Sequence, residues 1–193
     1  GTVTCWGDPA AGGDCRDLDL AGTTDIYSTY HAFVALNRNT GKATCWGDPT
    51  WGGDCSGLNF TGISTIYSTR YAFLAVSKTD GRTVCWGERK KGGDCEGLNL
   101  LGFDDIHSSW GVFLAHNPQT GAVRCWGSHR AYYGDMRACS SHNFSADVTI
   151  HSSPHAFLAL DRQAGTAVCW GDADAGDCSD VNFTGVTEVV SDR

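Results

Sequence analysis

Residues 65–95, TIYSTRYAFLAVSKTDGRTVCWGERKKGGDC, contain one complete unit of a repeat that runs through the chain. The triplet Cys-Trp-Gly recurs with spacings of 40, 40, 40 and 44 residues, beginning at Cys5, Cys45, Cys85, Cys125 and Cys169. A second cysteine, preceded by a Gly-Asp pair, follows each triplet, at Cys15, Cys55, Cys95, Cys139 and Cys178. A fixed period of this length predicts stacked copies of one small structural unit.

Each period contains three short segments rich in β-branched and aromatic residues and bounded by turn-forming residues. In the quoted unit these segments are 65–68, 72–76 and 83–86, and a turn ending at Gly81 joins the second to the third. First segments recur at 25–28, 105–108, 149–152 and 188–191, and second segments at 32–36, 112–116 and 156–160. No helical pattern of ten residues occurs, so the sequence predicts an all-β protein.

Three strands in every 40 residues, with no helix to cover them, must bury their apolar faces against copies of themselves. We therefore expect about five propeller-type blades in a single repeat domain over 1–193, arranged either as a closed ring or as an open superhelical array. The tryptophans of the triplets are expected to fill the seams between blades: Trp6, Trp46, Trp86, Trp126 and Trp170.

The first and last units are out of phase. The chain opens in a third segment at 1–5 and closes in a first segment at 188–191, and it contains only four second segments. In a ring, the two ends would form one split blade that lacks its middle strand. Two alternatives are a segment of a longer array, or protomers that complete each other's blade head to tail and so build a filament.

The repeat resembles that of a known superfamily. Its register Ile-x-Ser-x-x-x-Ala-Phe-Leu-Ala, followed by a glycine turn, Trp-Gly and a downstream Gly-Asp, is similar to the repeat of the regulator of chromosome condensation superfamily, which includes bacterial β-lactamase-inhibitor propellers. The resemblance extends over essentially the whole chain and implies propeller blades, but it says little about function. The paired cysteines depart from the family pattern, and the insertion with which the chromatin-associated exchange factor engages its GTPase has no counterpart here.

Ten cysteines, two in each unit, indicate five disulfides. The simplest pairing closes each loop on itself, joining Cys5 to Cys15, Cys45 to Cys55, Cys85 to Cys95, Cys125 to Cys139 and Cys169 to Cys178. Zinc is the competing interpretation, but the chain has no Cys-x-x-Cys pairs. Oxidised cysteines predict a secreted or cell-surface protein.

Three N-glycosylation motifs hold the same register, since each asparagine lies four residues after the second cysteine of its unit: Asn59, Asn143 and Asn182. Glycosylation would agree with an extracellular location. The alternative is that asparagine simply suits this turn, because the third unit keeps Asn99 without the hydroxyl residue that the motif requires.

Charge and hydropathy exclude two classes of partner. The chain has 14 basic and 22 acidic side chains, a formal net charge of −8, which argues against binding the phosphate backbone of nucleic acid. No apolar run approaches the ~18 residues of a membrane-spanning helix, so membrane insertion is not expected.

The acidic residues follow the repeat, which favours turn hydrogen bonds over acid and base catalysis. In four units a second acid follows the triplet, at Asp8, Asp48, Glu88 and Asp172. Calcium is a conceivable ligand for such loops, but they lack the dense pattern of oxygen ligands that calcium requires. We therefore expect neither enzymatic activity nor a cofactor.

The fourth unit diverges from the others and carries a candidate contact loop, which consists of His129, Arg130, Tyr132, Tyr133 and Arg137. Tyrosine and arginine are favoured in protein interfaces. The sequence thus favours a non-catalytic extracellular structural or interaction protein. Its specific form would be a head-to-tail subunit of a glycosylated filament or surface assembly, binding copies of itself through its terminal strands. The alternative is a soluble lectin-like or inhibitor-like propeller that binds carbohydrate or protein, in part through Trp51 and Trp110.

Overall fold

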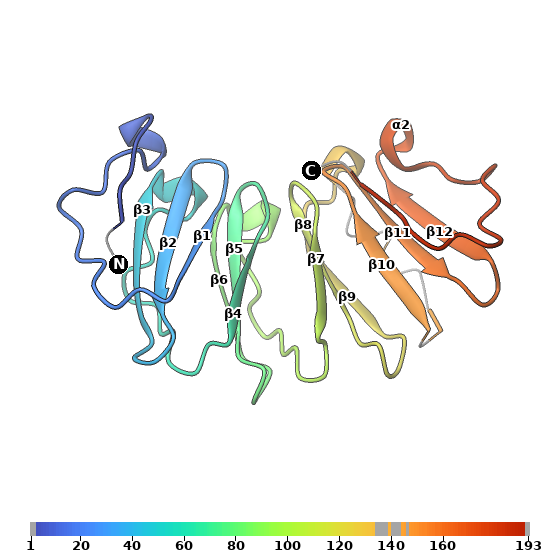
Figure 1. Cartoon of the computed structure of the whole chain (residues 1–193), viewed down its shortest axis with the longest axis horizontal. Helices are drawn as coiled ribbons and strands as arrows, with labels where there is room; N and C mark the ends of the chain where they lie inside the picture. The colour runs from blue at the N-terminus through green and yellow to red at the C-terminus, as the bar shows by residue number, and fades with distance from the viewer. Residues whose placement is uncertain (1–2, 134–138, 140–143, 146, 192–193) are drawn as a thin grey trace. The chain divides into compact units, whose positions relative to one another are not determined.

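A computed structural model describes residues 3–133, 139, 144–145 and 147–191 of the chain. It is all-β, as expected, and its strands form four separate three-stranded antiparallel sheets (Figure 1). The chain divides into two compact units, Gly1–Leu101 and Gly102–Arg193, which are called unit 1 and unit 2 below. In the described residues no helix has the length and apolar character needed to cross a membrane.

Unit 1 contains two blades, in each of which the strands follow one another in chain order. The first blade consists of β1 (Asp25–Ser28), β2 (Ala32–Asn37) and β3 (Lys42–Gly47). The second consists of β4 (Thr65–Ser68), β5 (Ala72–Val76) and β6 (Thr83–Gly87). Three single-turn 3-10 helices lie outside the sheets: η1 (Pro9–Ala11), η2 (Pro49–Trp51) and η3 (Arg89–Lys91).

Unit 2 repeats the same plan. Its first blade consists of β7 (Asp105–Ser108), β8 (Val112–His116) and β9 (Val123–Gly127). Its second consists of β10 (Val148–Ser152), β11 (Ala156–Asp161) and β12 (Thr166–Gly171). Two short helices, η4 (Ala131–Tyr133) and α2 (Ala173–Gly176), occupy the places that η2 and η3 hold in unit 1.

The middle strands form the centre of each blade. Every residue of β5 and of β8 is buried, and each of these strands is flanked by the two other strands of its blade. In unit 1, Val34 and Leu36 of the first blade pack in one cluster with Ile66 and Phe73 of the second. Burial of such side chains contributes roughly 1.5–3 kcal/mol each, so the blades of a unit stabilise each other by sharing a core.

Four of the five tryptophans of the triplets are buried, and Trp86 and Trp170 each pack in a cluster shared by the two blades of their unit: Trp46, Trp86, Trp126 and Trp170. Each stacks on a phenylalanine of its own middle strand, as Trp86 does on Phe73 at 4.9 Å between ring centroids. The prediction is wrong for Trp6, which is 84 % exposed.

The terminal segments also differ from expectation. Residues 3–5 and 188–191 are not strands, although their composition predicts them. A strand is defined by its ladder of backbone hydrogen bonds. Neither segment forms such a ladder with a neighbouring strand. Ring closure, the split blade and the single domain over 1–193 stay predictions.

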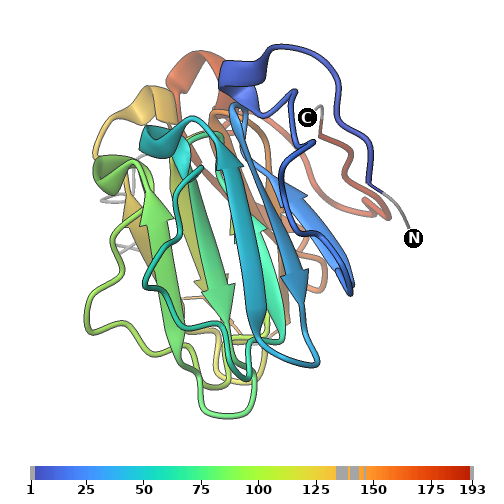
Figure 2. The same cartoon turned by 90° about the vertical axis from the view of Figure 1, so that its left-hand side faces the viewer.

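The order of strands brings particular loops to the same end of each blade. Since β1 and β3 both run antiparallel to β2, the turn after β1 and the helix after β3 lie at one end, as Figure 2 shows for the first blade and η2. The turn between β2 and β3 lies at the other end. We call the first end the tip end of a blade and the second its turn end.

Candidate functional site

The tip ends of the first three blades are each held by the same type of hydrogen bond. The hydroxyl of Thr29 donates to the carbonyl of Trp51 at 3.1 Å, and the hydroxyl of Thr69 donates to the carbonyl of Lys91 at 3.1 Å. In unit 2 the hydroxyl of Ser109 donates to the carbonyl of Tyr133 at 2.5 Å. A hairpin tip is thereby fixed against the last residue of the following short helix.

Neighbouring tips are joined as well. The backbone N–H of Tyr30 donates to the carbonyl of Arg70 at 3.1 Å, and that of Trp110 donates to the carbonyl of Pro154 at 2.7 Å. Residues 40 or more positions apart in the sequence are therefore brought side by side at the surface.

In unit 1 these bonds assemble an aromatic–cationic ladder, which consists of Tyr30, His31, Trp51, Arg70, Tyr71 and Lys91. Its rings lie in edge-to-face contact, with centroid distances of 4.2 Å between His31 and Trp51 and 4.6 Å between Trp51 and Tyr71. Tyr30 lies 4.7 Å from His31 and is 62 % exposed. The ladder is thus a row of half-buried rings that ends in the exposed ring of Tyr30.

Two cations complete the ladder. The guanidinium carbon of Arg70 lies 4.0 Å from the ring centre of Tyr30, and the ammonium nitrogen of Lys91 lies 3.6 Å from that of Tyr71. Cations over aromatic faces gain roughly 0.5–2 kcal/mol from the ring quadrupole. Both side chains are half-buried, so their charges are held in place at the surface of the tips.

Unit 2 carries a second group at its tip end, the tip cluster, which consists of Trp110, Tyr132, Tyr133 and His155. His155 lies 4.2 Å from Trp110 and 4.5 Å from Tyr132 between ring centroids, and its Nδ1–H donates to the carbonyl of Tyr132 at 2.6 Å. Tyr132 is 50 % exposed. The cluster thus brings four rings from three separate segments of unit 2 together at the tip end.

The structure brings together only part of the expected contact loop. Tyr132 and Tyr133 lie in the tip cluster, whereas His129 and Arg130 are exposed residues between β9 and η4. Arg137 lies outside the described residues. The ladder residues Tyr30, Arg70 and Tyr71 were not predicted. They lie just after the first strand of their repeats, at positions where the residue type differs between repeats while the flanking positions stay similar. That variation could have revealed them.

The five disulfides join the pairs expected from the sequence, with Cα–Cα distances of 5.7 Å to 6.2 Å. The bridges close loops of 9 to 14 residues between the third strand of one unit and the start of the next. No cysteine is free. Disulfides at this density indicate an oxidising environment outside the cytosol.

The repeated carboxylates form turns. Each of the four that the structure describes accepts a hydrogen bond from the backbone N–H two residues later, as Asp54 does from Ser56 at 2.9 Å and Asp177 from Ser179 at 2.9 Å. These bonds lower the pKa of both carboxyls, and a side-chain hydrogen bond from Arg16 lowers the pKa of Asp14 to about 2. They are therefore anionic acceptors at neutral pH, which suits a turn better than proton transfer.

Acids, histidines and cysteines form no group of three or more able to hold a metal ion, within the residues that the structure describes. In the first loop, Asp8 caps η1 by accepting from the N–H of Ala10 at 2.9 Å. Asp48 does the same for η2, accepting from Thr50 at 2.8 Å. The second acid of these loops thus has a structural partner in the backbone.

Asn59 and Asn182 are exposed, and each accepts a hydrogen bond at its side-chain oxygen from the backbone two residues later, at 2.9 Å. Asn99, which has no motif, makes the same bond to the N–H of Leu101 at 3.0 Å. The turn therefore accounts for the register of the asparagine whether or not a glycan is attached. Asn143 lies outside the described residues.

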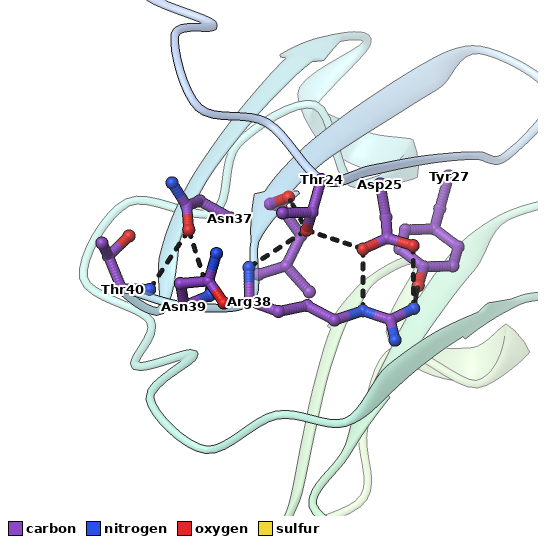
Figure 3. Close-up of polar contacts among 8 residues, drawn as sticks. Thr24, Asp25, Tyr27, Asn37, Arg38, Asn39 and Thr40 are labelled. Carbon is purple, nitrogen blue, oxygen red and sulfur yellow. Dashed lines mark hydrogen bonds and ion pairs between the residues drawn. The ribbon is translucent and has the colours of Figure 1, made fainter.

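At the turn end of the first blade lies an ion pair. Figure 3 shows the guanidinium of Arg38 against the carboxylate of Asp25, at 2.7 Å and 2.8 Å, and against the hydroxyl of Tyr27 at 2.9 Å. The hydroxyl of Thr24 donates to Asp25 at 2.7 Å, and Asn37 accepts from the turn that follows β2. This network joins the start of β1 to the turn after β2 and is structural.

Unit 2 places histidines where the other blades have different residues. His116 is fully buried in the slot of Leu36, Val76 and Leu160, and its Nδ1 lies 3.3 Å from the carboxylate of Asp105. The other oxygen of Asp105 lies 2.7 Å from Nε2 of His107. The carboxylate of Asp105 thus lies between His107 of its own strand and His116 of the neighbouring strand.

A comparison with protein-family models and with curated proteins finds no match. Among solved structures, the chain is similar to the ectodomain of the receptor kinase CR4 from Physcomitrella patens, with a TM-score of 0.54 and 16 % identity over 78 % of this chain and 41 % of that one. It is also similar to the CRINKLY WD40 ectodomain of the receptor kinase ACR4 from Arabidopsis thaliana, with a TM-score of 0.49 and 15 % identity over 77 % of this chain and 49 % of that one.

A third similar structure is Prp20p from Saccharomyces cerevisiae, with a TM-score of 0.49 and 17 % identity over 77 % of this chain and 45 % of that one. The chain spans less than half the length of each of these proteins. At such identity the likeness concerns the fold alone, and among the three it is carried by CR4. Together with the three-stranded blades, it shows that the chain is built from propeller-type repeats similar to those of the regulator of chromosome condensation.

Proposed function

We propose that the chain is a non-catalytic extracellular interaction domain that binds another macromolecule at the tip ends of its blades. The observation that carries this proposal is the row of rings in the ladder, which ends in the exposed Tyr30 and is held by hydrogen bonds between successive tips. Aromatic residues and arginine dominate the energetics of protein interfaces because they offer large, rigid contact areas. Their placement on loops above a rigid sheet is typical of binding sites.

The extracellular location is supported by the five disulfides and by the exposed glycosylation motifs. The CR4 structure is the ectodomain of a receptor kinase, and a domain of the same fold in that setting agrees with this location. The absence of catalysis is supported by the carboxylates, which serve as acceptors in turns.

The proposal is tested by changing one residue in each tip surface. Tyr30→Ala and Tyr132→Ala remove exposed rings, and Arg162→Ala changes an exposed residue just after β11, at a turn end. Purified oxidised protein is applied to panels of extracellular proteins and glycans. We expect at least one ligand whose binding is weakened by a tip variant and not by Arg162→Ala. Equal binding by all three variants to every ligand would overturn the proposal.

A second candidate function, head-to-tail self-association, is favoured by one observation. Ile66 of the second blade is 3 % exposed because the first blade covers it, whereas the equivalent Ile26 of the first blade is 46 % exposed. Beside it lies a groove of about 350 Å³ lined by Val3, Trp6, Ile26, Phe33 and Trp46, among others. A strand of the type of β2 fits this surface, because that is what covers Ile66.

In a filament this strand would come from another copy of the chain. Electron microscopy and light scattering of the purified protein test this candidate, with Ile26→Glu as the variant that places a charge in the groove. Regular filaments that Ile26→Glu abolishes would support it. Monodisperse monomers at high concentration would exclude it.

A further inference from the structure

Proline follows the acid of the disulfide-closed loop in two of the five repeats. The first loop contains the bond Asp8–Pro9 and the second contains Asp48–Pro49, whereas the third and fifth loops continue from the acid with Arg89 and Ala173. An aspartyl–prolyl bond is more labile in acid than other peptide bonds. The side-chain carboxyl attacks its own backbone carbonyl, and the tertiary nitrogen of proline is a good leaving group.

In both loops the carboxylate is folded back along the bond to proline. Oδ1 of Asp8 accepts from the backbone N–H of Ala10 at 2.9 Å. Oδ1 of Asp48 accepts from that of Thr50 at 2.8 Å. Since each donor lies on the far side of the proline, the hydrogen bond holds the carboxylate beside the peptide bond that joins the two residues. A nucleophile held in this way avoids much of the entropic cost of reaching its target.

The carbonyl of the same bond accepts two backbone hydrogen bonds, from the N–H groups three and five residues later. For the carbonyl oxygen of Asp8 the distances are 3.1 Å and 2.7 Å. For that of Asp48 they are 3.1 Å and 2.8 Å. Paired donors at such distances stabilise the negative charge that develops on a carbonyl oxygen when a nucleophile adds to its carbon, as in the oxyanion hole of an acyl-transfer enzyme.

The two bonds are open to water, because Pro9 and Pro49 are exposed. Each also lies inside a loop that a disulfide closes, Cys5–Cys15 for the first and Cys45–Cys55 for the second. A break at either bond therefore leaves the chain covalently joined, and separate pieces appear only after reduction.

We propose that the chain cleaves itself at Asp8–Pro9 and Asp48–Pro49. A carboxylate oxygen of the aspartate forms a bond to the backbone carbonyl carbon of the same residue, and the two N–H groups bind the resulting oxyanion. When the carbonyl re-forms, the bond from carbon to the proline nitrogen breaks and the nitrogen takes a proton from solvent. Water then hydrolyses the cyclic anhydride. The net change is the addition of one water molecule, which leaves an aspartate with two carboxylates and a proline with a free amine.

Each bond reacts once, so this is self-processing and not enzymatic turnover. It goes beyond the binding function proposed above and does not depend on it.

The third loop contains part of the same arrangement. The carbonyl oxygen of Glu88 accepts from the N–H groups three and five residues later, at 3.0 Å each, so both donors are present. The side chain of Glu88, however, makes no hydrogen bond to cap η3, and the next residue is Arg89, which supplies an ordinary secondary amide. We expect this bond to stay intact, which makes the third loop an internal control.

The test uses the full oxidised chain, incubated in mildly acidic buffer with protease inhibitors and then reduced for mass analysis. We expect peptides that end at Asp8 and Asp48 and peptides that begin at Pro9 and Pro49. The unreduced chain should gain the mass of one water molecule per cut. Cleavage in the folded chain should be at least about a hundredfold faster than in a chain reduced and unfolded in urea, since losing a single such donor commonly has an effect of this size.

Two variants remove the reacting groups of the second loop. Asp48→Asn keeps an acceptor for the N–H of Thr50 but lacks the carboxylate, and Pro49→Ala restores an ordinary amide as the leaving group. Each should abolish the cut after residue 48 and leave the cut at Asp8–Pro9 unchanged as the reference. Intact disulfides and an unchanged melting temperature establish that each variant is folded.

A further variant supplies the missing groups to the third loop. Glu88→Asp combined with Arg89→Pro should create a new cut after residue 88, because the two donors are already in place there. Glu88→Asp alone is the matched control and should create none.

The inference fails if the folded wild-type chain shows neither cut. It also fails if the folded and the unfolded chain are cut at the same rate, because ordinary acid lability then explains the reaction. Cuts that persist in both Asp48→Asn and Pro49→Ala would assign the cleavage to a contaminating protease. Absence of a new cut in the combined variant at residues 88 and 89 would refute the role of the paired donors.

Discussion

The indole N–H of Trp86 donates to the carbonyl of Gly52 at 3.0 Å, across 34 residues of sequence. Trp46 and Gly12 form the same bond at 3.0 Å. In both cases the glycine belongs to the disulfide-closed loop of one sequence repeat, and the tryptophan belongs to the third strand of the next repeat. At these two tryptophans the loop that a disulfide closes therefore supplies the acceptor that positions the indole ring.

Gly52 is predicted to tolerate no side chain. Its φ is +103°, and a Cβ there would lie 2.6 Å from a ring carbon of Phe73. Gly52→Ala combines left-handed backbone strain with overpacking of a buried ring, and we expect it to lower the free energy of unfolding by about 3–4 kcal/mol. Urea denaturation measures the effect.

Gly57→Ala is the matched control, because Gly57 also has a positive φ, of +76°, but nothing lies within 4 Å of its Cβ position. Only the backbone strain applies there, about 1–2 kcal/mol. Equal losses for Gly52→Ala and Gly57→Ala would show that contact with Phe73 does not determine the seam.

Removal of one disulfide is predicted to destabilise unit 1 without changing its fold. The bridge from Cys45 to Cys55 has a sequence separation of 10 residues. On the chain-entropy model, a loop of this length contributes about 2–3 kcal/mol by restricting the unfolded chain. The double variant Cys45→Ala with Cys55→Ala should therefore unfold at lower urea concentration with an unchanged circular dichroism spectrum. An unchanged midpoint would show that the loop is already restricted without the bridge.

The sequence was sufficient for the blades because their information is local and repeated. The segments at 25–28, 65–68 and 72–76 coincide with β1, β4 and β5, since alternation and turn residues define a strand when its partner is the next segment in the chain. Trp6 lies in the same type of triplet as the buried tryptophans, and residues 188–191 have the composition of a first strand, but neither is paired with a neighbouring strand. Their exposure depends on tertiary neighbours, which composition does not reveal.

The ladder was not predictable by the same route. Residues 30, 70 and 110 are Tyr, Arg and Trp, and residues 51 and 91 are Trp and Lys, so no periodic pattern marks them. They become neighbours because hydroxyls at the preceding positions bind carbonyls about 22 residues later in unit 1. Candidate sites in a repeat protein thus lie where the units differ, at positions that the shared backbone brings together.

His151 is predicted to make unit 2 less stable as the pH falls below neutral. Burial lowers the pKa of His151, with help from the charges of His107 and Arg162 and against that of Asp105. A histidine with a lowered pKa in the folded state stabilises it fully above its ordinary value of about 6.5, and this stability is lost as the pH falls. In His151→Tyr, which places there the residue found at Tyr27 and Tyr67, melting temperature should fall less between pH 7.5 and 5. An identical pH profile for both proteins would contradict this role.

Asp105 is predicted to affect the stability of the folded state at a lower pH than His151 does. Burial tends to raise the pKa of its carboxyl, but hydrogen bonds and charges from His107 and His116 outweigh that effect and lower the pKa. A carboxyl with a lowered pKa stabilises the folded state above its ordinary value of about 3.9, and this stability is lost as the pH falls further. Asp105→Asn should therefore destabilise the protein at pH 7 and make little difference near pH 2.5. Denaturation in urea at several pH values measures the difference, and a constant gap between the two proteins would refute the assignment.

The glycosylation motifs are predicted to be occupied when the chain is secreted from eukaryotic cells. Asn59 and Asn182 are exposed and lie in the same turn as Asn99, which lacks only the hydroxyl residue two positions later. Asn59→Gln should remove one glycan from the intact mass, and Leu101→Thr should add one at Asn99, because Leu101 is exposed and its replacement completes the motif. Asn99→Gln combined with Leu101→Thr serves as the control that the added mass is at this asparagine. If glycosidase treatment leaves the mass of the wild-type chain unchanged, the asparagines serve the turn alone, and their common register follows from the hydrogen bond to the backbone.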